Sequence, residues 1–229
     1  MQIGVVKEIK VDENRIAITP AGARELVADG HELVVESGAG LGAGYPDRSY
    51  ERAGASIVAD AGEVWGATLI VKVKEPQPAE IDHITSRHII FAYLHLAADP
   101  ELARRLAATG ATCIAYETMR DGKLLPLLIP MSEIAGRIAV LAAAYHLGRV
   151  SGGRGVLMGG ITGVPPAEVL VIGAGTAGTN AVAQAVGLAA SVKVLDRDLE
   201  RLREVEERFA GRVQCLYSTV ATIEELVPE

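Results

Sequence analysis

Short apolar runs rich in β-branched residues alternate with segments of helical spacing along the first half of the sequence. Runs of this kind, bounded by glycine, proline or polar residues, predict buried strands, and the segments between them predict helices. We expect strands at residues 3–6, 16–19, 32–36, 56–58, 68–73, 88–94 and 112–117. Strands that are apolar throughout and alternate with helices indicate an α/β fold with a mostly parallel sheet covered on both faces.

Two of the expected helices have marked ends. Thr19 can cap a helix that has Pro20 in its first turn. Asp99 is the corresponding cap of another helix, in which Pro100 takes the first position and Gly110 ends the segment.

Two prolines precede a long helical pattern from about Ser132 to Arg149, and we place a domain boundary there. The first domain is expected over residues 1–128 and the second over residues 129–229. A glycine-rich connection, SGGRGVLMGGITGVPP, follows the long helix and leads into a second α/β unit. The apolar face of the long helix can serve as domain core or as a subunit interface.

The second domain contains the stretch EVLVIGAGTAG, which is typical of a dinucleotide-binding loop. Gly173, Gly175 and Gly178 directly follow an apolar strand and open a helix. The first glycine permits a tight turn, the second lets the backbone approach a diphosphate, and the third lets helix and strand pack closely. The next expected strand ends in Asp196, 18 residues beyond Gly178.

Asp196 can accept hydrogen bonds from an adenine-side ribose, which favours NAD because a 2′-phosphate would meet a carboxylate. Arg197 follows it and leaves NADP open. The glycine motif alone would also fit a turn without a ligand, but the strand–loop–helix–strand–acid series favours the nucleotide. A second glycine-rich stretch, at residues 34–44, lacks an immediate helix and a matching acid, so we expect a plain connection there.

Three cationic side chains stand at or near the ends of expected strands in the first domain. Lys74 ends one apolar strand, His95 ends another, and Arg15 lies in a polar loop. Because parallel sheets bind ligands beyond the carboxyl ends of their strands, the three predict a pocket for a small carboxylic acid that undergoes proton transfer. Each one taken singly also fits a structural role, as a solvated cation or as a hydrogen-bonded core histidine.

The chain of 229 residues has a formal net charge of −7, with 49% hydrophobic and 22% charged residues. This profile predicts a soluble globular protein and argues against a general nucleic-acid or membrane surface. The longest apolar stretch, residues 138–148, is too short to span a bilayer. Cys113 and Cys215 lie far apart without metal-ligand spacing, which predicts buried, reduced thiols in the cytoplasm and no metal site.

Several stretches together resemble the alanine dehydrogenases, within the wider family that includes the transhydrogenase alpha subunit. They run in family order almost to residue 218: IGVVKEIKVDENRIAITP, VKVKEP, FAYLHLAAD, AYETM, PLLIPMSEIAGRIA, GGRGVLMGGITGVPPAEVLVIGAGTAGTNA and VLDRDLERLR. The resemblance implies a substrate domain followed by a Rossmann-type domain. It also implies NAD-dependent, reversible oxidative deamination of L-alanine to pyruvate and ammonia.

The resemblance further implies residue roles. Arg15 and Lys74 would bind the substrate, and His95 would be the catalytic acid and base beside Lys74. Met131 and Ser132 would lie next to the cofactor, although Ser132 can equally cap the long helix. The remaining cofactor contacts would come from the glycine loop and the strand ends that follow it: Gly173, Gly175, Thr176, Ala177, Gly178, Asp196, Arg201 and Ser218.

Members of this family continue with the second half of the Rossmann domain and a further catalytic aspartate, which this sequence does not contain. We therefore expect an incomplete nucleotide domain, and weak or absent dehydrogenase activity of the 229-residue chain alone. A non-catalytic nucleotide-binding or partner module is one alternative, and a transhydrogenase alpha subunit is another. The family generally forms hexamers, so a homo-oligomer is expected.

Overall fold

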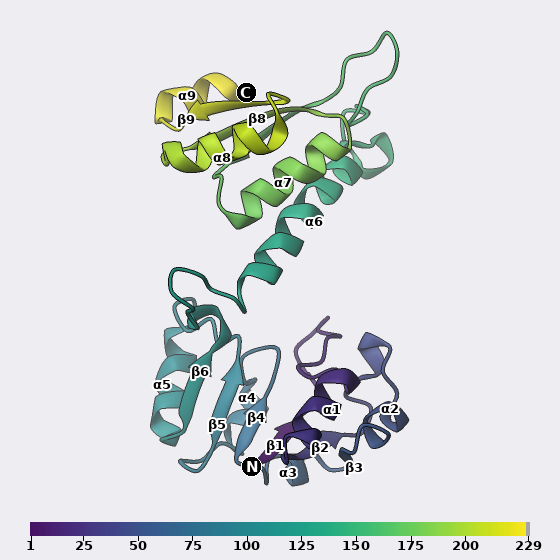
Figure 1. The fold of residues 1–229 in the computed structure, drawn as a ribbon, viewed down its shortest axis with the longest axis vertical. Helices are drawn as coiled ribbons and strands as arrows, with labels where there is room; N and C mark the ends of the chain where they lie inside the picture. The colour runs from purple at the N-terminus through teal and green to yellow at the C-terminus, as the bar shows by residue number, and fades with distance from the viewer. Residues whose placement is uncertain (228–229) are drawn as a thin grey trace. The chain divides into compact units, whose positions relative to one another are not determined.

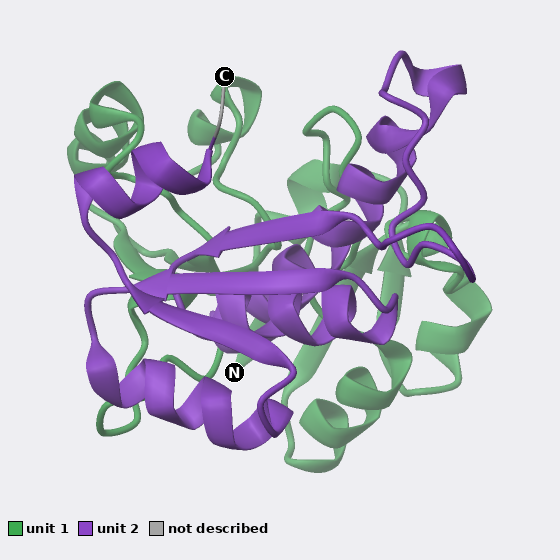
Figure 2. Cartoon of the chain, turned by 90° about the horizontal axis from the view of Figure 1, so that it is seen from above, with its two compact units in different colours: residues 1–127 green, residues 128–229 purple. Residues whose placement is uncertain are grey.

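The computed structural model describes residues 1–227, which form parts of two compact units, Met1–Leu127 and Leu128–Glu229. Figure 2 shows the first unit in green and the second in purple. Each unit is an α/β structure built on its own sheet, and every pairing between the described strands is parallel. The predicted fold class, a parallel α/β protein, is confirmed.

The sheet of the first unit has six strands in the order β3-β2-β1-β4-β5-β6. Their neighbours along the sheet can be followed in Figure 1, where β4, β5 and β6 lie side by side. The strands are β1 (Gln2–Val5), β2 (Glu32–Glu36), β3 (Ser56–Val58), β4 (Leu69–Val71), β5 (Ile89–Ala92) and β6 (Thr112–Ala115).

The order of the strands reverses between β1 and β4. Gly4 of β1 pairs with Val34 of β2 on one side and with Ile70 of β4 on the other. Doubly wound sheets bind ligands at such a reversal, beyond the carboxyl ends of the strands. The loops after β1, β4 and β5 therefore meet where a ligand site is expected.

Helices cover both faces of this sheet, so the strands are apolar on both sides. Ile70 and Val71 are consecutive in β4 but belong to different cores, as the two-residue period of a strand requires. One core includes residues of α1 (Pro20–Ala28) and α2 (Asp47–Glu51). The other includes residues of α3 (Ala61–Val64), α4 (Pro78–Ile81) and α5 (Pro100–Thr109).

The predicted helix caps of the first unit are confirmed. Thr19 accepts a hydrogen bond from the N–H of Gly22 at 3.2 Å, and α1 begins at the next residue. Asp99 accepts from the first turn of α5, which ends before Gly110, a residue with a φ of 73°. Gly110 thus occupies the left-handed position that commonly terminates a helix.

The strand predicted at residues 16–19 is wrong. Ile16, Ala17 and Ile18 pack against the core as half-buried residues of the segment that leads into α1, without pairing to the sheet. A β-branched apolar run has the same pattern whether it pairs with a strand or only packs against one. The predicted strand at 112–117 is shorter than expected, because residues Tyr116–Thr118 turn into the 3-10 helix η2.

The second unit begins with the long helix α6 (Ile129–Leu147), which packs against α7 (Thr176–Gly187). Its start lies before Ser132, and Leu128 occupies the cap position, so a capping role for Ser132 is excluded. A three-stranded parallel sheet in the order β7-β8-β9 follows. Its elements are β7 (Glu168–Ile172), β8 (Ser191–Asp196), α8 (Leu199–Phe209), β9 (Val213–Tyr217) and α9 (Val220–Leu226).

Within residues 1–227, none of the helices combines the length and the apolar character needed to cross a membrane.

Candidate functional site

Arg15 lies in the loop between β1 and α1 and is paired with Glu13. Its Nε donates to Glu13 Oε1 at 2.8 Å and its Nη2 donates to Glu13 Oε2 at 2.6 Å. These hydrogen bonds lower the pKa of the Glu13 carboxyl, and the charge of Lys74 lowers it further. The two cations predicted from the sequence, Arg15 and Lys74, therefore share an ionised neighbour that the sequence did not single out.

His95 follows β5 and has a φ of 50°, in the left-handed region that residues with side chains rarely adopt. Its backbone N–H donates to Glu117 Oε1 at 2.7 Å, and that of Leu94 donates to Glu117 Oε2 at 3.3 Å. The exposed imidazole stacks on Tyr93, with ring centroids 6.1 Å apart. The His95 ring is thus presented to solvent at the carboxyl edge of the sheet.

Tyr93 links the histidine to the arginine. Burial raises the pKa of its phenol, the charge of Glu117 raises it further, and the charge of Arg15 lowers it. Tyr93 therefore lies within electrostatic range of Arg15 and Glu117, and its ring stacks on that of His95. Tyr93 and His95 both follow the last residue of β5, so the alternation of a strand does not predict their contact, and no sequence pattern signals it.

Lys72, directly after β4, is a further buried cation of the first unit. Lys72 is fully buried, and its Nζ lies 2.7 Å from Glu80 Oε1 and 3.3 Å from Glu8 Oε2. Glu8 also accepts from the backbone N–H groups of Val73 and Lys74. Burial raises the pKa of the Glu8 carboxyl, against the opposing charge of Lys72. The stretch VKVK at residues 71–74 is the sequence signal for this pair, because it puts Lys72 at the end of an apolar strand and a buried lysine needs a carboxylate partner.

Arg15 lines a small polar depression together with Lys7, Glu8, Glu13, Asn14, Gly38, Ala39 and Gly42. Lys74 is connected to Arg15 through Glu13, and His95 is connected to it through Tyr93. A guanidinium, an ammonium and an imidazole along one edge suit the binding of a carboxylate and the transfer of a proton.

The glycine loop of the second unit has a backbone conformation and close contacts that leave no room for side chains at two of its glycines. Gly173 has a φ of 101°. A Cβ on Gly178 would lie only 1.7 Å from the carbonyl oxygen of Gly173, so helix α7 approaches β7 more closely than any other residue would allow. Gly175 caps α7, whose first N–H groups and partial positive charge are suited to a diphosphate.

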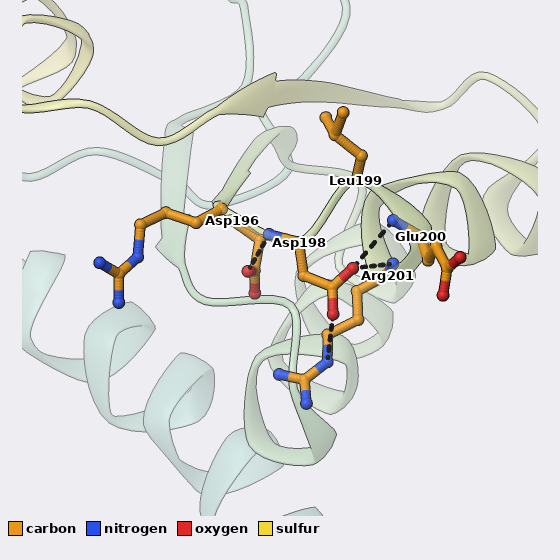
Figure 3. Close-up of a pocket in the computed structure, with 6 residues that line it drawn as sticks. Asp196, Asp198, Leu199, Glu200 and Arg201 are labelled. Carbon is orange, nitrogen blue, oxygen red and sulfur yellow. Dashed lines mark hydrogen bonds and ion pairs between the residues drawn. The ribbon is translucent and has the colours of Figure 1, made fainter.

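Asp196 ends β8 next to this loop. Its carboxylate accepts from the N–H of Ala174 at 2.5 Å and from that of Asp198 at 2.8 Å. These two bonds, that of Asp198 first, lower the pKa of Asp196, so the carboxyl is ionised and can accept bonds from a ribose diol. Residues 196–201 line a hollow at this point, drawn in Figure 3.

Arg201 lies between this hollow and the glycine loop. Asp198 accepts from its N–H at 3.4 Å, and the two side chains form an ion pair, as Figure 3 shows. The Arg201 guanidinium comes within 3.7 Å of where a Cβ on Gly175 would stand. It also lines a second hollow together with Ala174, Gly175, Thr176 and residues of α6 and α8.

The other predicted cofactor residues occupy three places. Thr176 and Ala177 are exposed in the first turn of α7, and Ser218 follows β9 with its N–H donating to the carbonyl of Asp196 at 2.9 Å. Met131 and Ser132 lie in the first turn of α6. From that helix, Ile129 and Glu133 line the hollow beside the glycine loop, and Met131 and Ser132 do not.

The two cysteines were predicted to be buried, and in the structure they are free and half-buried. Burial raises the pKa of both thiols. Residues 1–227 hold no group of three or more histidine, cysteine, aspartate or glutamate side chains placed to bind a metal ion.

Sequence models of two domains match the chain: the alanine dehydrogenase/PNT N-terminal domain over residues 4–135, and the C-terminal domain of the same name over residues 139–229. Alanine dehydrogenase of Bacillus subtilis is 48% identical over 229 residues, which are all of this chain and 61% of the relative. That of Mycolicibacterium smegmatis is 50% identical, over 99% of this chain and 62% of the relative. The chain thus spans about three fifths of the length of these curated relatives.

Solved structures agree with this similarity. An L-alanine dehydrogenase superposes with a TM-score of 0.93 at 48% identity, covering 99% of this chain and 63% of that one. A transhydrogenase from Sinorhizobium meliloti superposes with a TM-score of 0.80 at 29% identity, covering 99% of this chain and 66% of that one.

Proposed function

The chain belongs to the alanine dehydrogenase/PNT family, and on that premise we propose that it supplies the substrate domain and part of the nucleotide domain of an NAD-dependent alanine dehydrogenase. The reaction is the reversible oxidative deamination of L-alanine to pyruvate and ammonia. The observation that carries the proposal is an identity of 48–50% to curated alanine dehydrogenases, against 29% to the transhydrogenase.

Substrate binding is assigned to Arg15 and Lys74. Glu13 accepts two hydrogen bonds from the guanidinium and fixes its plane, which orients this cation for a substrate carboxylate. Lys74 adds a second positive charge beside the same acid and stabilises negative charge that develops on the substrate oxygen. Together they hold the Cα of alanine in one orientation.

The cofactor site is assigned to the second unit. When bound, NAD accepts a hydride from the Cα of alanine. The Gly173–Gly178 turn and the start of α7 would hold its diphosphate, and Asp196 would hold the adenine-side ribose. Arg201 would line the adenosine, with Thr176, Ala177 and Ser218 around the loop and Met131 and Ser132 on α6. The carboxylate of Asp196 at the end of β8 favours NAD over NADP, because it repels a 2′-phosphate.

His95 is assigned the proton transfers on the oxidised substrate. Loss of hydride leaves an iminium carbon, and the His95 imidazole removes a proton from water as the water oxygen bonds to that carbon. The same imidazole returns that proton to the nitrogen and then takes up the hydroxyl proton of the adduct as the C–N bond breaks, so ammonia leaves and pyruvate forms. Lys74 stabilises the oxygen through both steps.

The test requires the rest of the nucleotide domain. In a chimaera, the 229-residue chain is continued by the part of the Bacillus subtilis relative that it does not match. We expect NADH formation from L-alanine, and a fall in kcat of about 10²–10⁴-fold for His95→Ala. His146→Ala, at an exposed histidine of α6, is the matched control and should leave kcat unchanged.

Full turnover by the folded His95→Ala chimaera would show that His95 has no catalytic role. An unsubstituted chimaera that binds NAD but does not oxidise alanine would overturn the dehydrogenase assignment and favour a nucleotide-binding module.

The proposal extends to a homo-oligomer in the cytoplasm. Ile134, Ile138, Leu141 and Tyr145 are exposed along α6 at spacings of three and four residues, which place them on one side of the helix. A second copy of the chain would cover such a stripe, and the free thiols suit a reducing compartment. Light scattering measures the mass in solution, and a monomer at every concentration would contradict this part.

A further inference from the structure

A carboxylate accepts hydrogen bonds from two successive backbone N–H groups just beyond the carboxyl end of β4, an arrangement that we call a carboxylate clamp. Glu8 Oε1 accepts from the N–H of Val73 at 2.6 Å and from that of Lys74 at 3.4 Å. Its side chain is almost completely buried, and its other oxygen faces the buried ammonium of Lys72. Glu8 therefore has little freedom to change position.

The same arrangement recurs beyond the next strand, β5. Glu117 accepts from the N–H of Leu94 at 3.3 Å and from that of His95 at 2.7 Å. Of these two donors, His95 has a left-handed backbone conformation, with a φ of 50°. A histidine is not expected to keep that conformation unless its surroundings impose it.

The sheet order explains why the two clamps are alike. β4 and β5 are neighbours, with β1 on the outer side of β4 and β6 on the outer side of β5. Glu8 follows β1 and Glu117 follows β6, so each acid reaches inward from the outer strand to the end of the inner one. In each clamp the second donor residue, Lys74 or His95, has a proposed role in the reaction.

We propose that Glu8 and Glu117 are positioning residues, which fix the backbones of Lys74 and His95 and so set the distance between the ammonium and the imidazole. This inference rests on the proposed function. Hydrogen bonds that a charged carboxylate accepts are stronger than neutral ones, and here they hold the backbone of each residue while its side chain is left for the reaction. Neither acid needs to touch the substrate.

The first test is made on the 229-residue chain itself, by NMR of assigned backbone signals. Glu117→Gln keeps the size of the side chain but replaces one acceptor oxygen by a donor. We expect the His95 amide proton to move upfield and its Cα shift to leave the left-handed pattern, with the Lys74 amide unchanged. Glu8→Gln should move the amides of Val73 and Lys74 and leave His95 unchanged.

Glu101→Gln is the matched control, because Glu101 is exposed and its side chain pairs with Arg104 on the same helix. It should move none of these signals. If Glu8→Gln does not fold, the triple variant Glu8→Gln with Lys72→Met and Glu80→Gln removes the whole buried charge cluster and supplies the measurement. Unchanged His95 signals in folded Glu117→Gln would overturn the inference.

The second test separates this inference from the proposed function. In the chimaera, Glu117→Gln should lower kcat about 10–100-fold and leave the KM for NAD unchanged, because the nucleotide loop lies in the other unit. Loss of activity in His95→Ala but not in Glu117→Gln would overturn the positioning role alone. Full activity in His95→Ala would overturn the role of the histidine, and the NMR result would still decide whether the clamps exist.

Discussion

Asp196 acts within the protein before any ligand is present. Its carboxylate joins the N–H of Ala174 in the glycine loop to the end of β8. The folded pKa of Asp196 lies below its ordinary value of 3.8 because it accepts these backbone hydrogen bonds. The ionised carboxylate therefore stabilises the folded state fully at pH values above its ordinary pKa of 3.8. This contribution is lost as the pH falls through the lower pKa of the folded state.

An acid titration of stability tests this effect. Asp196→Asn should lower the free energy of unfolding by an amount that is constant from neutral pH down to about 5, and the difference from the unsubstituted chain should shrink in stronger acid. Urea unfolding followed by circular dichroism at a series of pH values measures it. Glu168→Gln, at the opposite end of β7, is the control. A difference that does not depend on pH would contradict the lowered pKa.

Nucleotide binding gives a second test of the same side chain. Asp196→Asn should weaken the binding of ADP-ribose by about tenfold or more, since a hydrogen bond to a charged group is worth about 1.5–3 kcal/mol. The loss should be smaller for the 2′-phosphorylated analogue, which the carboxylate repels. Calorimetry on the 229-residue chain measures both affinities, and equal losses would argue against contact between Asp196 and the ribose.

Single residues also show what the sequence could and could not predict about the site. Lys74, His95 and Asp196 stand out because they interrupt or end apolar strands. Glu117 lies 22 residues from the His95 amide that it accepts from, and Glu8 lies 66 residues from Lys74. Only the pairing of the strands brings these acids to their partners, and no local pattern encodes that pairing.

Among the elements, α5 has a cap whose contribution can be measured. Asp99 accepts from the N–H groups of Glu101 and Leu102, which have no partner within the helix. Asp99→Ala should lower the free energy of unfolding of the first unit by about 1 kcal/mol. The fluorescence of Trp65, the sole tryptophan of the chain and a buried residue of this unit, reports that transition in urea. No change relative to the unsubstituted chain would mean that the cap is dispensable.

The approach of α7 to β7 gives a prediction with an internal control. Gly178→Ala would put a Cβ 1.7 Å from the Gly173 carbonyl, so we expect destabilisation by about 1–3 kcal/mol and loss of ADP-ribose binding. Gly187, in the last turn of the same helix, has open space around it, and Gly187→Ala should be neutral or stabilising. Thermal unfolding and calorimetry compare the two, and equal effects would contradict the close approach.

The ends of elements were harder to predict than their existence. The pattern at Ser132 suggested a helix start, because serine is a common cap. The helix begins earlier, at Ile129, with Pro130 in its first turn. A proline is well tolerated there, since the first N–H groups of a helix make no bond within it.

In each unit of the chain, the candidate site residues lie at or beyond the carboxyl ends of parallel strands. Hydrophobic patterning predicted parallel α/β sheets, because apolar strands alternating with helices have few other solutions. It did not predict that β4 would pair with β1 instead of β3. That pairing creates the reversal beside which Arg15, Lys74 and Glu13 are found.

The fate of the hydrogen on the Cα of L-alanine is the most direct test of the proposed reaction. The chimaera is incubated with NAD and L-alanine deuterated at Cα, and the NADH and pyruvate formed are analysed by mass spectrometry. We expect NADH that carries the deuterium, pyruvate in equal amount, and the loss of both products in His95→Ala. NADH without deuterium, or pyruvate formed without NADH, would contradict it.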